Sequence, residues 1–201
     1  MSTAIATEAR YTPEDLLAMP DSEGYELVDG QLVERKMGAE SSGVGGDLLA
    51  LLVPHCKQRG LGRALPADTG YQCFPDDPSR LRKPDVSFIR KDRLPGGRLP
   101  KGWVKFPPDL AVEVVSPNDL AEEVEEKRKD YRKAGVPLIW VIYPGARTAR
   151  VHRGDGSAVD LTEDDDLSGE DVIPGFRCPL REILPPREEA GEVQVARGGS
   201  T

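Results

Sequence analysis

The stretch DLAVEVVSPNDLAEEVEEKRKDY, residues 109–131, decides the fold of this chain. Its first part, residues 109–115, predicts a strand buried on both faces, because apolar residues starting at Leu110 alternate between the two sides. Glu113 interrupts this apolar run. A carboxylate in a central strand is costly unless a cation or hydrogen-bond donors compensate it. We therefore expect a positively charged or hydrogen-bonding group beside Glu113.

The second part of the stretch predicts a helix that begins at Asn118 or Asp119 and ends at Gly135. One stripe of this helix consists of Leu120, Val124, Tyr131 and Ala134. Lys127 lies seven residues after Leu120, near the middle of the same stripe. Two interpretations stay open: Lys127 faces the core near Glu113, or it snorkels past its apolar neighbours to solvent.

The composition of the whole chain indicates a globular protein with one substantial core. The chain has 201 residues, of which 38% are hydrophobic and 31% charged. We expect a leader at residues 1–10, a single domain at 11–184 and a polar tail at 185–201. No apolar run approaches the roughly 20 residues of a membrane span. The sequence MSTAIATEAR lacks the pattern of a secretory signal, and three widely spaced cysteines form no zinc motif, which predicts reduced thiols in a cytoplasmic protein.

The charge is unevenly distributed along the chain. The net charge of −8 argues against a protein that coats nucleic acid. The basic window, residues 80–105, nevertheless has nine basic residues and two acidic ones, and is therefore +7. Residues 155–171 contain eight acidic residues and no basic one. Such a molecule could bind a phosphate backbone on one side; the alternative is that the basic window is an ordinary solvated loop.

Further elements follow from local patterns. Asp29-Gly30 separates two apolar segments, 25–28 and 31–34, and predicts a hairpin. Two more helices are predicted: a short one opened by Thr12-Pro13, and one at about 44–60 that Pro54 could kink or end. Strands are predicted at 63–74, 84–89, 137–143 and 148–152, and residues 159–161 add at most a short edge strand. Residues 92–108 predict a long loop.

Three carboxylates stand out against these elements. Asp85 follows Pro84 at the start of a strand, Glu113 lies in the next strand, and Glu26 lies in the hairpin. Converging carboxylates with a lysine beside them suit Mg²⁺ or Mn²⁺, which can polarise a phosphoryl oxygen and activate water. The alternatives are that Asp85 caps a turn and that Glu26 is an ordinary edge-strand residue.

Four ordered motifs carry a resemblance to a known family. The runs YELVDG, PDVSFI, DLAVEVVSPND and EKRKDYRKAGVPLIWVIYP, within residues 11–153, resemble the Uma-type putative restriction endonucleases of the PD-(D/E)XK nuclease superfamily. The resemblance implies an α/β fold (an α+β mixed sheet) with a restriction-endonuclease-like core, in which helices flank a central mixed sheet that holds a divalent-metal site. It implies that Pro84-Asp85 is the PD element, Glu113 the second acid and Glu26 a further acid. The carbonyl of Val114 would be a main-chain metal ligand.

The chain departs from the family pattern in two places. The superfamily lysine lies two residues after the second acid, where this chain has Val115. In similar proteins the lysine comes from the following helix, at the position of Lys127, which agrees with the stripe described above. Many relatives have a histidine near the start of the second helix, whereas this chain has Ser41-Ser42. The missing histidine affects the details of the expected site and not the expected fold.

The leading hypothesis is a Mg²⁺- or Mn²⁺-dependent endonuclease that hydrolyses DNA phosphodiester bonds. The expected catalytic residues are Asp85, Glu113, Lys127 and Glu26, and the expected metal ligands are Asp85, Glu113, Val114 and Glu26. The residues expected to contact DNA are Arg82, Lys83, Arg90, Lys91 and Arg93. Resemblance to nucleases that cut two strands predicts a homodimer. The alternatives are an inactive nucleic-acid- or protein-binding module on the same fold and, third, a hydrolase of a smaller phosphate compound.

Overall fold

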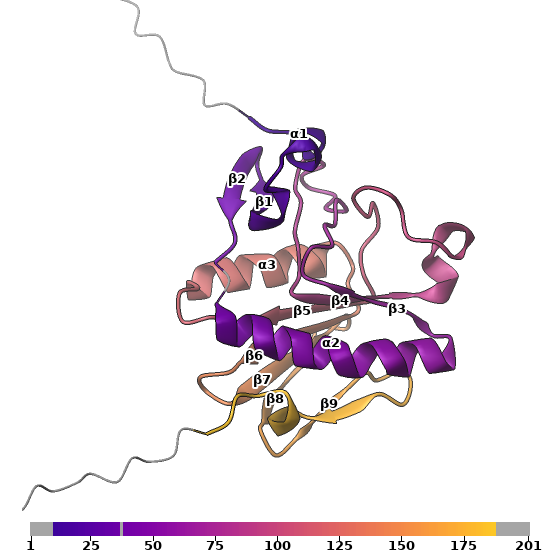
Figure 1. Cartoon of the computed structure of the whole chain (residues 1–201), viewed down its shortest axis with the longest axis vertical. Coiled ribbons are helices and arrows are strands. Elements are labelled where there is room, and N and C mark those ends of the chain that lie inside the picture. Colours follow the sequence, from indigo (N-terminus) through magenta and orange to yellow (C-terminus); the bar gives the residue numbers. More distant parts are fainter. Residues whose placement is uncertain (1–9, 37, 188–201) are drawn as a thin grey trace, which may run out of the picture.

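A six-stranded mixed sheet forms the centre of the molecule (Figure 1). The structure, a computed structural model, describes residues 10–36 and 38–187, so nearly all of the expected leader and most of the expected tail lie outside the described residues. The strands are β3 (Gly62–Pro66), β4 (Val86–Arg90), β5 (Leu110–Val114), β6 (Leu138–Tyr143), β7 (Thr148–Arg153) and β8 (Ala158–Thr162), adjacent in that order. Only β5 and β6 pair in parallel within this sheet. The predicted mixed sheet flanked by helices is confirmed.

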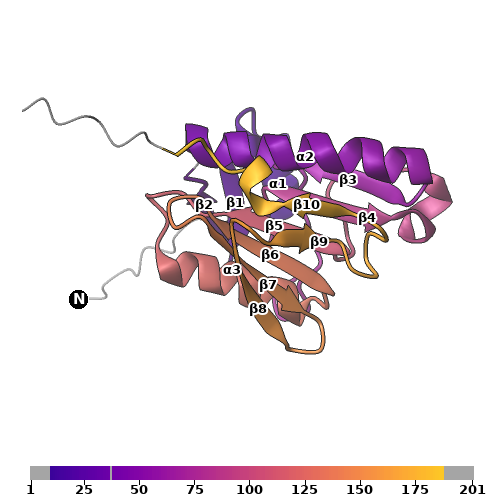
Figure 2. The ribbon, with the colours of Figure 1, turned by 90° about the horizontal axis from the view of Figure 1, so that it is seen from below.

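Different elements cover the two faces of the sheet (Figure 2). Helix α2 (Ala39–Arg59) covers one face together with the C-terminal segment, which contains β9 (Asp166–Ser168) and β10 (Arg177–Pro179). Helix α3 (Ala121–Lys133) covers the other face. Because side chains alternate along a strand, Leu110 of β5 belongs to the α2 core and Ala111 to the α3 core. Glu113 lies two residues after Ala111, so its side chain points to the same face of the sheet, toward α3.

Helix α3 is the crossover that the parallel pair β5–β6 requires. It begins at Ala121 with Leu120 as the N-cap, so the predicted start at Asn118 or Asp119 was too early. The Asp119 carboxylate instead accepts a hydrogen bond from the backbone of Ser116, which stabilises the turn before the helix. Leu120 is 59% exposed and does not belong to the buried stripe, because it precedes the first helical turn. The predicted end at Gly135 is confirmed by its positive φ of 83°.

The N-terminal part forms a small layer of its own beside the sheet. It consists of α1 (Pro13–Ala18), β1 (Tyr25–Val28) and β2 (Gln31–Glu34), and the last two form the predicted hairpin. Asp29 and Gly30 have φ values of 51° and 78°, as a two-residue turn with both φ values positive requires. Leu16, Leu27 and Leu81 form a separate apolar cluster that attaches this layer to the segment before β4.

The structure corrects two further predictions and adds one pair of strands. Helix α2 starts earlier than expected and continues through Pro54, because Leu48, Leu52 and Cys56 pack the helix against the sheet on both sides of the proline. The predicted strand 63–74 ends at Pro66. The β9–β10 pair was not predicted. The short 3₁₀ helices are η1 (Ser22–Gly24), η2 (Lys91–Arg93), η3 (Pro95–Gly97) and η4 (Leu180–Glu182). Within the described residues, no helix has the length and apolar character needed to cross a membrane.

Candidate active site

Glu113 lies between the sheet and α3, where two side chains of the helix bind its carboxylate. The Nζ of Lys127 is 3.2 Å from Glu113 Oε2, and the Tyr131 hydroxyl donates to Oε1 at 2.6 Å. The side chain of Lys127 is 21% exposed and that of Glu113 only 7%. Lys127 therefore faces the core rather than snorkelling to solvent, and the expected compensating group beside Glu113 is present.

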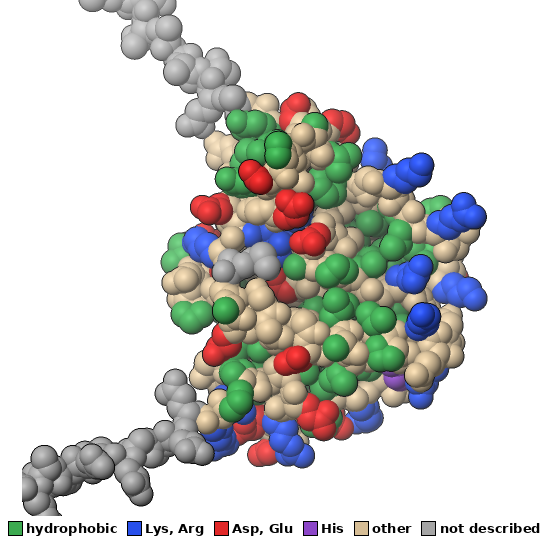
Figure 3. All heavy atoms as spheres, viewed as in Figure 1, with side chains coloured by type: hydrophobic (Ala, Val, Ile, Leu, Met, Phe, Trp, Pro, Cys, Tyr) green, Lys and Arg blue, Asp and Glu red, His purple; other side chains and the backbone are tan. Residues whose placement is uncertain are grey.

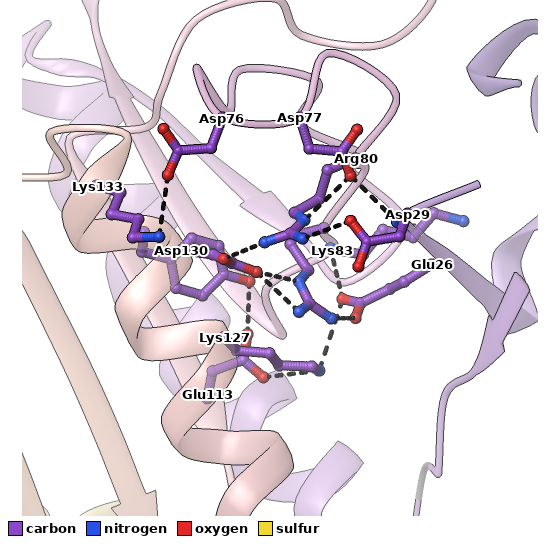
Figure 4. A network of polar contacts seen from close by, with 12 residues as sticks. Glu26, Asp29, Asp76, Asp77, Arg80, Lys83, Glu113, Lys127, Asp130 and Lys133 are labelled. Atoms are coloured by element: carbon purple, nitrogen blue, oxygen red, sulfur yellow. Dashed lines mark hydrogen bonds and ion pairs between the residues drawn. The ribbon is translucent and has the colours of Figure 1, made fainter. Parts of the chain in front are cut away.

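Glu26 reaches the same place from the hairpin (Figure 4). Its side chain is 1% exposed, and its Oε1 is 3.5 Å from Lys127 Nζ. The backbone N–H of Lys83 donates to Oε1 at 2.7 Å, and Arg82 Nη1 donates to Oε2 at 3.0 Å. Both oxygens of Glu26 are thus occupied by protein donors.

Arg82 is the centre of an ion-pair network, and each of its three side-chain nitrogens has a carboxylate partner. Beyond Glu26, its guanidinium binds Asp130 of α3 through Nε at 2.8 Å and Nη2 at 2.7 Å. Arg80 binds the other oxygen of Asp130 and also pairs with Asp29 of the hairpin turn. The network therefore joins the hairpin, the segment before β4, and α3, which fixes the position of Glu26 relative to Lys127.

Asp85, directly before β4, has a different partner. Its Oδ2 accepts from the backbone N–H of Val114 at 2.8 Å, and its Oδ1 accepts from Arg35 Nη2 at 3.1 Å. The side chain of Arg35 is 4% exposed, and the same Nη2 also donates to the carbonyl of Lys83 at 3.3 Å. The Nε and Nη1 of Arg35 are buried without a hydrogen-bond partner.

These groups surround a pocket of about 110 Å³. Its wall contains Glu26, Arg35, Arg82, Glu113 and Lys127, and acidic side chains of α3, Glu123 and Glu126, extend around it. Lys36 and Glu123 pair with each other at 2.9 Å between β2 and α3. Asp85 does not line the pocket within the part of the chain that the structure describes. The guanidinium of Arg35 lies against the Asp85 carboxylate, and Arg35 is one of the residues that line the pocket.

Burial and neighbouring charges shift the pKa values of these groups. Burial, opposed by Lys127 but reinforced by Asp85 and Glu26, raises the pKa of Glu113 to about 7. Burial also raises the pKa of Asp85, against the hydrogen bond from Val114 and the charges of Lys127 and Arg35. Burial disfavours a charged Lys127, but the three carboxylates outweigh it and raise its pKa, so the ammonium stays protonated at neutral pH. Burial opposes ionisation of Glu26 too, yet Lys127 and Arg82 lower its pKa.

The structure brings together Glu26, Glu113 and Lys127, and it places Asp85 close enough to affect the pKa of Glu113. Among the described residues, however, no group of three or more His, Cys, Asp or Glu side chains is arranged to hold a metal ion. The metal ligands expected from the sequence include the carboxylates of Asp85 and Glu113 and the carbonyl of Val114. Two carboxylates and a carbonyl suit Mg²⁺ or Mn²⁺, which bind few protein ligands and otherwise water or phosphate. The chemistry of these residues fits such an ion.

The residues expected to contact DNA divide into two groups. Arg82 and Lys83 are buried; Arg82 belongs to the ion-pair network, and the Lys83 ammonium donates to the carbonyl of Ser22 and lies 5.2 Å from the centre of the Trp103 ring. Burial, which disfavours the charged form, lowers the pKa of Lys83. The structure therefore engages both side chains in internal contacts, although Arg82 also forms part of the pocket wall.

Arg90 and Lys91 are exposed, and Arg93 is partly exposed and pairs with Asp109 at 3.0 Å. They lie near the C-terminal end of α2, whereas the pocket lies near its N-terminal end. With 21 residues, α2 spans about 30 Å between them. Figure 3 shows Lys and Arg side chains gathered over this distant edge, around β3 and the segment after β4.

Sequence reasoning missed two residues of the site. Tyr131 lies on the predicted buried stripe, but nothing in the pattern indicated that its hydroxyl would bind Glu113. Arg35 follows the second hairpin strand, and its pair with Asp85 spans 50 residues. A buried carboxylate needs a partner, which is the signal for an unidentified cation near Asp85, but the sequence does not indicate which one.

The fold is a mixed sheet flanked by helices, in which Asp85 lies directly before β4, Glu113 lies in the neighbouring strand β5, and Lys127 of α3 faces Glu113. It is similar to a nuclease fold. A solved structure described as a putative nuclease from Anabaena variabilis has this fold, with a TM-score of 0.72 at 19% identity, over 86% of this chain and 97% of the other. No curated protein matches the chain.

The chain belongs to the Uma2 family, described as putative restriction endonucleases, which it matches over residues 13–181. This membership confirms the family expected from the four sequence motifs and supports a nuclease function.

Proposed function

We propose that this protein is a divalent-metal-dependent endonuclease that hydrolyses phosphodiester bonds of DNA. The observation that carries the proposal is the meeting of Glu113, Glu26 and Lys127 at one pocket, with Asp85 nearby, directly before the neighbouring strand β4. Asp85, Glu113 and the Val114 carbonyl would hold Mg²⁺ or Mn²⁺. When bound, the ion would polarise the phosphate and lower the pKa of the attacking water.

Lys127 would orient the water and offset negative charge that develops on the phosphate. Its raised pKa means that it acts as a fixed cation and hydrogen-bond donor rather than as the general base. The ammonium is held between Glu113 and Glu26, so its position is set before substrate arrives.

Glu26 would act as a positioning residue in this arrangement. Its Oε1 accepts from the Lys83 backbone and lies 3.5 Å from Lys127 Nζ, and its Oε2 accepts from Arg82, so Glu26 holds the Lys127 ammonium from the side opposite Glu113. We therefore assign Glu26 to the orientation of Lys127 and reserve metal binding for Asp85, Glu113 and Val114.

The exposed cations near Arg90 and Lys91 would bind the DNA backbone away from the cleavage position. About 30 Å of α2 separates them from the pocket, close to one helical turn of B-DNA at roughly 34 Å. A duplex lying along this direction would present phosphates to both places.

An inactive binding module on the same fold is the second candidate. The pair between Arg35 and Asp85 favours it, because a guanidinium already compensates one of the expected ligands. The buried cations of the basic window, Arg82 and Lys83, bind groups inside the protein, which reduces the positive charge available to bind DNA.

A nuclease assay with Mn²⁺ on linear, supercoiled and single-stranded DNA tests the proposal, with melting temperature measured at increasing Mn²⁺ concentrations. We expect cleavage and a metal-dependent rise in melting temperature, both lost in Asp85→Ala. Glu126→Gln is the matched control, because it removes one exposed carboxylate from the same pocket. A wild-type protein that neither cleaves DNA nor responds to metal would contradict the proposal and favour the binding module.

A further inference from the structure

Arg35 occupies a position that a metal ion at the proposed site would have to compete for. Its Nη2 is 3.1 Å from Asp85 Oδ1, and Arg35 lines the pocket while Asp85 does not. A guanidinium is the positive charge that a buried carboxylate needs in the absence of another cation. Two cations cannot bind the same carboxylate oxygen at contact distance without strong repulsion.

The hydrogen bonding of Arg35 is incomplete. Of its three side-chain nitrogens, only Nη2 has partners, whereas Nε and Nη1 are buried and unpaired. Buried polar groups without partners destabilise the arrangement that contains them. Arg82 provides the contrast in the same pocket, because its nitrogens bind Glu26 and Asp130. The position of Arg35 is therefore much less favourable than that of Arg82.

We infer that Arg35 is a displaceable internal cation that occupies the metal-binding carboxylate Asp85 and must leave it for a divalent ion to bind. The inference rests on the proposed function, since it assumes that Asp85 is a metal ligand. Arg35 belongs to the short connection after β2, so its side chain can leave Asp85 without disrupting the central sheet. The consequence is a metal affinity that is weaker than the carboxylates alone would give.

The test is the affinity for Mn²⁺ alone, measured by isothermal titration calorimetry and by the metal-dependent shift of melting temperature. Arg35→Met keeps a long aliphatic side chain and removes the competing cation. We expect Arg35→Met to bind Mn²⁺ about tenfold more tightly than the wild type, which corresponds to about 1.4 kcal/mol.

Lys36→Met is the matched control. Lys36 is the next residue, lines the same pocket and carries the same charge, but it pairs with Glu123 rather than Asp85. Because Lys36 is 41% exposed and its charge is screened, we expect less than a threefold change in Mn²⁺ affinity. Similar tightening in both variants would show a general effect of charge and overturn the inference.

Two further outcomes separate this inference from the proposed function. Equal Mn²⁺ affinity in the wild type and Arg35→Met would overturn the displacement of Arg35 and leave the metal site intact. No Mn²⁺ binding by any variant, with melting in metal-free buffer showing each one folded, would overturn the proposed function and this inference with it. Arg35→Gln serves as a second variant should Arg35→Met not fold.

Discussion

Arg82 and Arg35 both bind a buried carboxylate beside the same pocket, but their surroundings differ. Arg82 binds Glu26 and Asp130 and connects the hairpin to α3, with its side chain 5% exposed. Arg35 is equally buried and uses one nitrogen out of three. Arg82 joins two elements of the fold through all of its nitrogens, whereas the inferred role of Arg35 is that of a cation that a metal ion can replace. Burial therefore does not separate these two arginines, whereas the number of hydrogen bonds that each guanidinium makes does.

The largest expected effect concerns the stability of the Arg82 network. Arg82→Met removes the guanidinium that Glu26 and Asp130 share, so we expect a loss of about 3–5 kcal/mol in the free energy of unfolding. Arg35→Met should cost about 1 kcal/mol, because Asp85 is 21% exposed and keeps the hydrogen bond from Val114. Urea denaturation of both variants measures the difference. Equal losses of stability in the two variants would show that Arg35 stabilises the fold as much as Arg82 does.

The next effect concerns Lys127, which lies between the network and the metal ligands. Lys127→Ala should reduce DNA cleavage at least about 100-fold, because a charge-stabilising donor is lost at the reacting phosphate. Its stability should change by no more than about 1 kcal/mol, because Tyr131 still donates to Glu113 and Arg82 still binds Glu26. Full activity in a folded Lys127→Ala variant would remove Lys127 from the catalytic assignment.

A second variant sharpens the prediction for Lys127. Val115 lines the same pocket, and its side chain points to the same face as that of Glu113, two residues before it. The double variant Lys127→Ala with Val115→Lys therefore places an ammonium where the superfamily pattern has its lysine. We expect partial recovery of cleavage relative to Lys127→Ala. A lysine in place of valine can also overpack the pocket, so circular dichroism must accompany the assay.

A smaller effect depends on the pH and concerns Glu113. Because the pKa of Glu113 is raised to about 7 in the folded protein, the folded state holds a proton that the unfolded state loses above its usual pKa near 4.5. The wild type should therefore lose stability relative to Glu113→Gln as the pH rises from about 4.5 to 7, and the difference should level off above that. Melting curves without metal at several pH values measure it. A difference that shrinks with rising pH would mean that ionised Glu113 stabilises the fold.

The smallest effect on the folded protein concerns the exposed part of the basic window. Reversing Arg90 and Lys91 to glutamate should leave stability nearly unchanged, since both are exposed. If each residue binds a phosphate, the slope of log K against log salt for DNA binding should fall by nearly one unit per contact. Fluorescence anisotropy with labelled duplex at several salt concentrations measures the slope. An unchanged slope would identify this region as a solvated loop.

The strand and helix around Glu113 were predictable because their signals are local. The alternation in β5 placed Glu113 on the face opposite Leu110, and the helical period placed Lys127 on the apolar stripe of α3. The structure then showed that Lys127 turns toward Glu113 rather than to solvent. The hairpin at Asp29-Gly30 follows from turn chemistry in the same way. The β9–β10 pair could not be recognised, because each strand has three residues, too few for a periodic signal.

The sequence by itself determined the buried carboxylate on a central strand and the apolar stripe that contains Lys127, and its family motifs indicated the mixed sheet. The tertiary structure alone decided which cation each carboxylate binds. Arg82 lies 56 residues from Glu26, and Arg35 lies 50 residues from Asp85. Such pairs depend on how the hairpin packs against β4 and α3, and no local periodicity specifies that packing. The same packing buries Arg82 and Lys83 inside the protein, although the sequence alone presents them as part of one basic window.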